Sequence, residues 1–174
     1  ILDGAKTFVS EAPVADLFVV FATVDPALGA MGITGFLVER DTPGLRVGNP
    51  IEKMGLRTSP MAELILEECR IPVENRLGRE GRGAGVFNDS MEWERSCILA
   101  SCLGGMERQL ETCTRYARER RQSGQRIGDF QLVSTKLVDM KVRLETARLA
   151  LYRAVWLKQQ GLPCGAEVAI AKLY

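Results

Sequence analysis

Hydrophobic residues in the second half of the chain recur with the period of a helix. From Leu99 to Ala117 they follow one another in alternating steps of four and three, which is typical of a helix buried along one side. A second stripe of the same period runs from Val133 to Val155. These stripes predict two long helices, and a Gly-Leu-Pro break after them predicts the start of a third. The predicted helices cover about residues 86–121, about 130–160 and 165 onward.

The segment Gln122–Gln125 separates the two long helices. Gly124 within it can take the left-handed conformation that often ends a helix. Helices joined by so short a loop pack antiparallel. One stripe per helix cannot close a core with two helices alone, so we expect further helices or a second subunit. The chain begins at Ile1 and ends at Tyr174 inside an apolar pattern, so we also expect a piece of a longer polypeptide.

The first half of the chain has the pattern of short β-strands. Four runs rich in β-branched and aromatic residues alternate with turn residues such as Pro and Gly. Short strands with frequent turns indicate a small antiparallel barrel or sandwich, so the predicted fold class is α+β. The predicted strands include Thr7–Val9, Leu17–Ala22, Thr34–Val38 and Leu64–Leu66.

Residues 73–85 form a polar connector that is rich in glycine. We place the domain boundary here, with a β-domain over residues 1–83 and a helical domain over residues 84–174. Three alternating glycines suggest a phosphate-binding loop, but the GxGxxG spacing and a following βαβ unit are both absent. A flexible hinge between strand and helix is therefore favoured over phosphate binding.

Composition and charge exclude several kinds of site. The net charge of +1 argues against nucleic acid as a main partner, although residues 84–174, with 14 basic and 10 acidic side chains, suit an anionic ligand. No apolar run approaches the roughly 20 residues of a membrane span. The absence of histidine removes His-based catalysis and His-ligated metals. The five cysteines have no CxxC spacing, so we expect no metal site and a reducing compartment, the cytoplasm or a mitochondrial matrix.

Two charged positions on the first predicted helix are candidates for chemistry. Glu94 lies near its start, and a carboxylate on a buried helix costs free energy unless it is paired, protonated or used. The structural alternative is an ion pair with Arg95 or with a neighbouring helix. A basic run ends the helix, where each arginine gains about 0.3–1 kcal/mol from the helix dipole. That stabilisation accounts for Arg118 and Arg121, whereas Arg120 is kept as a candidate contact to a cofactor phosphate.

Five motifs in register along the whole chain resemble those of acyl-CoA dehydrogenases. They are Lys6–Ser10, Asp41–Gly44, Gly55–Ser59, Glu94-Arg95, and Arg120–Gly124 followed by Phe130-Gln131. The resemblance implies a β-domain followed by the antiparallel helices of a four-helix bundle, incomplete here, with FAD bound between the two domains. It also implies that an amino-terminal helical domain and the last helices lie outside this sequence.

The resemblance also implies roles for individual residues at the cofactor. Phe8 takes the place of a tryptophan that packs against the flavin ring, and Ser10 that of a hydroxyl near the flavin's reactive nitrogen. Arg120, Gln122 and Gln131 take the places of FAD contacts, with the arginine at the pyrophosphate of the partner subunit's cofactor. A guanidinium suits phosphate because its planar fork donates paired, charge-assisted hydrogen bonds.

On the substrate side, the resemblance implies that Glu94 is the catalytic base. The isovaleryl- and long-chain-specific members place their glutamate directly before the helix arginine, as in Glu94-Arg95. Such enzymes remove an α-proton from an acyl thioester while a β-hydride passes to the flavin. Glu92 and Arg95 take positions that hold the pantetheine arm. Most members carry the base in a later loop, so a base beyond residue 174 is the alternative.

Two departures from the family pattern narrow the prediction. Ser123 replaces a phenylalanine that packs near the adenine, and Trp93 is bulky for its place. The sequence around Trp93 is more similar to the branch that oxidises acyl or aminoacyl thioesters held on carrier proteins.

The resemblance thus implies FAD-dependent α,β-dehydrogenation of an acyl thioester carried by CoA or by a carrier protein. A flavin oxidase or monooxygenase on the same scaffold and a non-catalytic helical scaffold protein are the alternatives. The implied partners are an electron acceptor such as an electron-transfer flavoprotein and further copies of the chain, as a homodimer or homotetramer.

Overall fold

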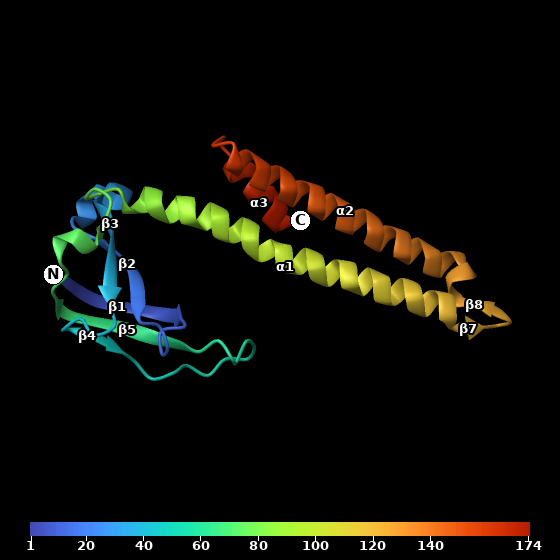
Figure 1. Cartoon of the computed structure of the whole chain (residues 1–174), viewed down its shortest axis with the longest axis horizontal. Coiled ribbons are helices and arrows are strands. Elements are labelled where there is room, and N and C mark those ends of the chain that lie inside the picture. Colours follow the sequence, from blue (N-terminus) through green and yellow to red (C-terminus); the bar gives the residue numbers. More distant parts are fainter. The chain divides into compact units, whose positions relative to one another are not determined.

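The computed structural model describes residues 1–174, which form two compact units, Ile1–Asn88 and Asp89–Tyr174 (Figure 1). The first unit contains all the longer strands, and the second is mainly helical. The long helix α1 (Gly83–Glu119) begins in the first unit and continues through the second. The predicted α+β class, with antiparallel strands followed by long helices, is confirmed.

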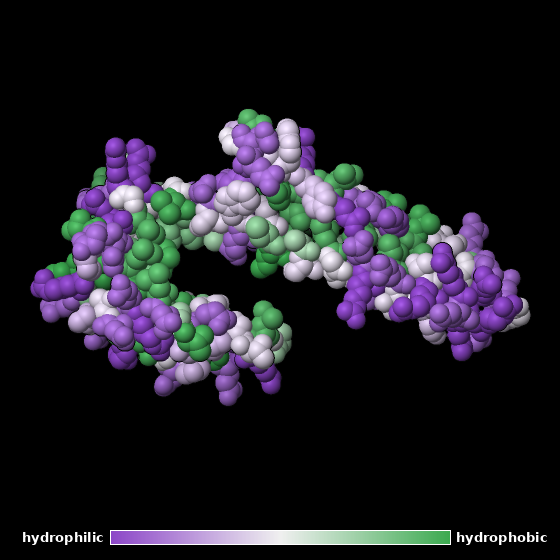
Figure 2. Space-filling view, viewed as in Figure 1, coloured by the Kyte–Doolittle hydropathy of each residue, from purple (hydrophilic) through white to green (hydrophobic).

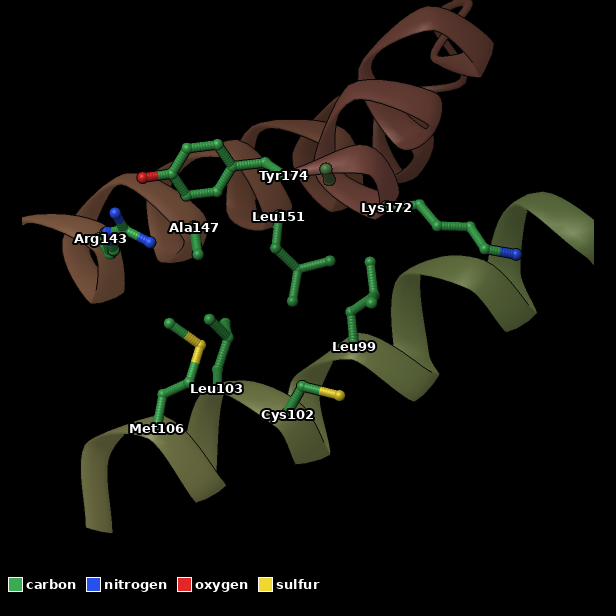
Figure 3. A pocket seen from close by; sticks show the side chains of 10 residues that line it. Leu99, Cys102, Leu103, Met106, Arg143, Ala147, Leu151, Lys172 and Tyr174 are labelled. Carbon is green, nitrogen blue, oxygen red and sulfur yellow. The ribbon is translucent and has the colours of Figure 1, made fainter. Parts of the chain in front are cut away.

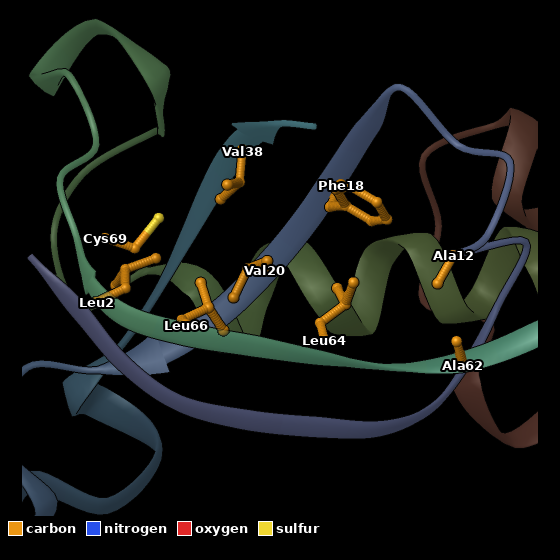
Figure 4. Packing of buried hydrophobic residues seen from close by; sticks show 9 residues of the cluster. All are labelled: Leu2, Ala12, Phe18, Val20, Val38, Ala62, Leu64, Leu66 and Cys69. Atoms are coloured by element: carbon orange, nitrogen blue, oxygen red, sulfur yellow. The ribbon is translucent and has the colours of Figure 1, made fainter. Parts of the chain in front are cut away.

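The first unit is built from two three-stranded antiparallel sheets. The first sheet has the order β1 (Leu2–Ser10), β5 (Met61–Cys69), β4 (Leu45–Val47), and the second has the order β2 (Leu17–Thr23), β3 (Ile33–Glu39), β6 (Arg76–Leu77). In β5, Ala62, Leu64 and Leu66 are buried in alternation, the period of a strand that covers a core with one face. They share one core with Phe18 and Val38 of the second sheet, so the two sheets pack as a sandwich (Figure 4).

The connector between the second sheet and α1 is fastened to that sheet. Short 3-10 turns, η1 (Pro26–Gly32) and η2 (Val73–Asn75), flank β3 and β6, which pair with each other. The backbone N–H of Gly81 donates to the buried Thr34 hydroxyl at 3.0 Å. A Cβ on Gly83 would lie 2.8 Å from Thr34 Cα, so only glycine fits at this close approach. Gly81 and Gly83 thus serve a close approach to neighbouring backbone, whereas a Cβ on Gly85 would meet no atom within 4 Å. The hinge between strand and helix stays a prediction.

Two long antiparallel helices form most of the second unit. After α1 come the hairpin strands β7 (Arg121–Gln122) and β8 (Gln125–Arg126), the turn η3 (Ile127–Asp129), α2 (Gln131–Gln159) and α3 (Gly165–Leu173). The predicted helix ends differ from these by three residues or fewer. Arg148 of α2 forms an ion pair with Glu107 of α1 at 3.0 Å. Lys158, later in α2, forms one with Glu92, earlier in α1, at 2.7 Å, so the two helices run antiparallel.

A second apolar stripe on α2 lies exposed. Val138, Val142, Leu149, Tyr152 and Trp156 recur at helical spacing, and each is more than half exposed. Figure 2 shows hydrophobic side chains along this helix. The exposed stripe agrees with the expectation that two helices cannot close a core by themselves. None of the helices combines the length and the apolar character that crossing a bilayer requires.

Candidate functional site

A β-bulge in β1 turns Phe8 away from the sheet. Lys6 pairs with Leu64 and Val9 pairs with Ala62, so β1 has one residue more than β5 over this stretch. Phe8 has a φ of 59°, a left-handed conformation that bulky residues rarely take, and it is 68% exposed. Backbone strain of this kind concentrates at ligand-binding sites. The bulge therefore presents an aromatic ring at the position that the sequence predicted as a flavin contact.

Ser10 ends β1 beside a cavity of about 470 Å³ within the first unit. The cavity is lined by residues of β1 and β2, which are the edge strands of their sheets. The Ser10 side chain makes no hydrogen bond within the chain, so its hydroxyl is free to bond a ligand. The lining residues are Lys6, Val9, Ser10, Glu11, Ala15, Leu17–Phe21 and Leu64.

Glu94 lies on the exposed face of α1. The buried side of the helix carries Ser96 and Leu103. Glu94 lies two residues before Ser96, which is a rotation of about 200° around the helix axis, so it points away from the buried side. Its carboxylate makes no hydrogen bond or ion pair within the chain. The ion pair with Arg95 or a neighbouring helix, which was the structural alternative, is therefore not formed. The sequence predicted Glu94 as a carboxylate on a buried helix, but Glu94 and Arg95 are both exposed in this chain.

Glu92 is engaged in a different way, by contacts that join α1 to α2. Its Oε2 accepts a hydrogen bond from Lys158 Nζ at 2.7 Å and one from Cys164 Sγ at 3.6 Å. Lys158 also donates to Asp89 and lies 5.8 Å from the centre of the Trp93 ring. The hydrogen bonds to Asp89 and Glu92 raise the pKa of Lys158 above its usual range. Burial, and then the nearby Glu92 carboxylate, raise the pKa of the Cys164 thiol.

The predicted FAD contacts of the helical domain meet at the junction of α1 and α2. The backbone of Arg120 is fixed on both sides, because its N–H donates to Tyr116 and its carbonyl accepts from Ile127, each at 2.8 Å. The Arg120 side chain is exposed and makes no ion pair. Gln122 lies in β7, and Gln131 is the first residue of α2. The three side chains therefore belong to one end of the second unit.

The hairpin at this junction has a tight two-residue turn. Ser123 and Gly124 have φ values of 51° and 81°, as a type I′ turn requires at both central positions. The sequence indicated the left-handed glycine but gave no signal for the left-handed serine. A phenylalanine at position 123 would have a bulky side chain on strained backbone, whereas serine relieves part of that cost.

Glu94 and Arg120 lie far apart along one helix. They are separated by 26 residues (120 − 94), which at 1.5 Å per residue corresponds to about 39 Å. That distance is longer than the separation of the flavin ring and the pyrophosphate in one FAD molecule. The two side chains therefore cannot belong to one compact site within a single copy of the chain.

A further cavity, of about 590 Å³, lies among α1, α2 and α3 (Figure 3). Leu99, Leu103 and Leu151 lie on its apolar wall, and these residues belong to the core of the second unit. None of the predicted site residues lines it. No group of three or more His, Cys, Asp or Glu side chains is placed to hold a metal ion.

Comparison with known sequences identifies relatives along the whole chain. Residues 1–69 match the sequence model of the acyl-CoA dehydrogenase middle domain, and residues 81–174 match that of the acyl-CoA dehydrogenase C-terminal domain. The chain is 51% identical over 172 residues to an L-prolyl peptidyl-carrier protein dehydrogenase of Pseudomonas fluorescens, with 99% of this chain and 45% of that protein covered. An enzyme of the same name from Serratia sp. is 46% identical, with the same shares covered.

Solved structures give the same result for the fold. The chain matches the prolyl acyl carrier protein oxidase AnaB with a TM-score of 0.91 and 52% identity, over 98% of this chain and 45% of that one. It matches PigA with FAD and proline with a TM-score of 0.93 and 45% identity, over 99% of this chain and 45% of that one. The chain thus spans slightly less than half the length of the relatives that it matches.

Proposed function

Because the chain belongs to the acyl-CoA dehydrogenase family, we propose that it forms part of a flavoenzyme that introduces a double bond between Cα and Cβ of an acyl thioester. The proposed substrate is a prolyl or similar aminoacyl group on a carrier protein, because relatives that are 46% to 52% identical are named for that substrate. The observation that carries the proposal is Glu94, a carboxylate on α1 that is exposed, unpaired and directly before Arg95.

The proposed cofactor is FAD, and the residues present fit it. Phe8 offers an exposed aromatic ring for stacking, Ser10 offers a free hydroxyl, and Arg120 offers a guanidinium without an ion pair. Gln122 and Gln131 lie at the same junction as Arg120 and add amide groups that can bond phosphate or ribose oxygens. When bound, FAD accepts the hydride that leaves Cβ of the substrate.

In the proposed reaction Glu94 takes the proton from Cα. The electron pair of that C–H bond forms the new double bond as hydride leaves Cβ, so the substrate is oxidised by two electrons and the carboxylate is protonated. A bound thioester would displace water from the exposed Glu94, and a carboxylate without its water shell is a stronger base. Arg95, next in sequence and also exposed, is proposed to hold the pantetheine arm.

Glu92 is proposed to support the substrate side mainly through the helix contact. Its carboxylate already accepts hydrogen bonds from Lys158 and Cys164, so it fixes α1 two residues before Glu94. This arrangement favours a supporting role for Glu92 near the pantetheine arm over a separate ionic contact with substrate.

The separation of Glu94 and Arg120 supports a homodimer or larger assembly. About 39 Å of helix lies between them, so Arg120 is proposed to bind the FAD that serves another copy of the chain. In this arrangement each FAD requires residues of two subunits.

The proposal is tested by Glu94→Gln in the full-length, FAD-loaded protein. Loss of a general base lowers turnover by about 10²–10⁴-fold, whereas FAD content should stay the same. Bleaching of the flavin absorbance by prolyl-carrier protein, followed by stopped flow, measures the step directly. Glu111→Gln is the matched control, because Glu111 is an exposed carboxylate on the same helix. A Glu94→Gln variant that bleaches at the wild-type rate would show that Glu94 is not the base.

A second candidate function is oxidation with oxygen as the final acceptor. It is favoured by one specific finding, the similarity to a prolyl acyl carrier protein oxidase at 52% identity. An oxidase reoxidises its reduced flavin rapidly in air. A dehydrogenase instead needs an acceptor such as an electron-transfer flavoprotein. The rate at which oxygen restores the flavin absorbance after substrate reduction therefore separates the two.

A further inference from the structure

Arg40 directs its guanidinium group to the loop that joins β1 to β2. It follows the last residue of β3, and its Nη1 donates to the carbonyls of Ala12 at 3.1 Å and Ala15 at 2.8 Å. Its Nη2 donates to the carbonyl of Pro13 at 3.1 Å. The backbone N–H of Arg40 adds a fourth bond, to the Asp16 carbonyl at 2.8 Å. A single residue directly after β3 thus donates to four carbonyls of one loop, those of residues 12, 13, 15 and 16.

These contacts are unusual for an arginine in this chain. Arg40 is partly buried and pairs with no carboxylate, so its charge is stabilised by carbonyl dipoles alone. Arginine suits this task because its planar fork carries donors in fixed directions, and a lysine ammonium cannot reproduce that geometry. The result is a fixed conformation for residues 12–16.

The clamped loop starts directly after Ser10. On its other side it is tied to the segment directly before β5, because the N–H of Glu11 donates to the Pro60 carbonyl at 2.7 Å and the Ser59 hydroxyl donates to the Glu11 carboxylate. Glu11 itself has a φ of 61°, so the chain turns sharply there. The loop is therefore held on both sides, with Arg40 as the attachment next to β3.

The cavity beside Ser10 has walls from both sides of this loop. Ser10 and Glu11 come before the carbonyls that Arg40 bonds, Ala15 carries one of them, and Leu17 comes after them. All four residues line the same cavity of about 470 Å³. The clamp thus fixes the loop that connects the Ser10 end of β1 to the start of β2. Releasing it would change the position of the Ser10 hydroxyl and the width of the cavity together.

We infer that Arg40 is a positioning residue that holds the Ser10 hydroxyl in place for the flavin by clamping the β1–β2 loop. The inference rests on the proposed function, since Ser10 is a proposed FAD contact. It adds a residue that touches neither cofactor nor substrate and acts through three carbonyl oxygens.

The test compares Arg40→Met, Arg40→Lys and Ser10→Ala in the full-length, FAD-loaded protein. The visible absorption and circular dichroism of the bound flavin are the main measurements, since a merely structural role would not move them in a specific direction. Arg40→Met should change both spectra in the same direction as Ser10→Ala and raise the FAD Kd by about tenfold. The double variant should show no larger change than the larger single one, because both act on one hydroxyl.

Two further measurements keep the outcome decisive. Arg46→Met is the matched control, because Arg46 is exposed and its only ion pair, with Glu67, is 3.9 Å long. Hydrogen exchange of the amides of residues 11–16 should accelerate in Arg40→Lys, which is the variant to use if Arg40→Met fails to fold. If Ser10→Ala changes the flavin spectra and both Arg40 variants leave them unchanged, the inference is overturned. If Ser10→Ala itself changes nothing, the proposed contact of Ser10 with FAD is wrong, and the inference falls with it.

Discussion

Lys158 of α2 donates to Glu92 of α1 over 2.7 Å, and this pair fixes α1 two residues before Glu94. The side chain of Lys158 is only 12% exposed, although it carries a charge at the end of a long aliphatic stem. Asp89 and the face of Trp93 complete its surroundings. The helix that carries the proposed base is therefore held to its neighbour by one cation with three partners.

Replacing Lys158 should destabilise the protein in a way that depends on pH. Hydrogen bonds to Asp89 and Glu92 raise the pKa of Lys158 in the folded state, so its contribution to stability is complete below the unfolded-state pKa of about 10.4. That contribution is lost as the pH rises toward the higher folded-state pKa. Lys158→Met should therefore lower Tm at neutral pH, and the difference from wild type should shrink above about pH 10.4.

Thermal melts of both proteins across the alkaline range measure this difference. Lys136→Met is the control, since Lys136 is exposed and makes no ion pair, and its melting curves should follow those of wild type. A Tm difference for Lys158→Met that is the same at every pH would contradict the ionic origin of the contact.

Arg120→Ala should weaken FAD binding, and Arg118→Ala should not. The guanidinium of Arg120 is exposed, unpaired and mounted on fixed backbone, so it can form charge-assisted bonds to a phosphate worth about 1.5–3 kcal/mol. The expected rise in Kd is about 10- to 100-fold, measured by titrating apoprotein with FAD. Arg118 lies in the last turn of α1 and is stabilised by the same helix dipole. Equal losses in both variants would mean that the dipole, and not a phosphate contact, explains these arginines.

The sequence predicted the fold best where local pattern and burial agree. Most of the stripe from Leu99 to Ala117 packs inward as predicted, although Met106 is exposed. The strand predicted at Leu64–Leu66 lies within β5, where both leucines are buried. The strands β4 and β6 were missed because they have three and two residues and depend on pairing with distant strands.

The sequence named candidate residues for the site, but it did not predict their surroundings. Motif register singled out Phe8 and Glu94 as candidates, and their roles stay predictions. The bulge at Phe8 depends on a register shift against β5, which no local signal encodes. The exposure of Glu94 follows from the rotation of α1 against α2, and the partners of Lys158 lie 66 and 69 residues away. The attachment of Gly81 and Gly83 to Thr34 was not predicted for the same reason, since this contact is tertiary.

Thr34→Val should destabilise the first unit by about 1–3 kcal/mol. The Thr34 hydroxyl is fully buried and accepts the Gly81 N–H at 3.0 Å, and valine of the same shape would leave that donor unpaired. Urea unfolding measures the change. Thr112→Val on α1 is the control, because the Thr112 hydroxyl is exposed and bonds only the Arg108 carbonyl of its own helix. If the two variants lose the same stability, the connector is not held by this hydrogen bond.

Two glycine-to-alanine substitutions should change the stability of the protein in opposite directions, for a purely conformational reason. A Cβ at Gly105 or at Gly124 would meet no atom of this chain within 4 Å, so crowding is the same at both sites. Gly105 lies inside α1, where alanine is favoured over glycine by about 1 kcal/mol. Gly124 has a φ of 81° in the hairpin turn, where an L-side chain costs about 1–2 kcal/mol. Gly105→Ala should therefore raise the urea midpoint of the protein, and Gly124→Ala should lower it. If Gly105→Ala is destabilising while Gly124→Ala behaves as expected, another segment or subunit must pack against α1 at Gly105, since nothing within this chain does.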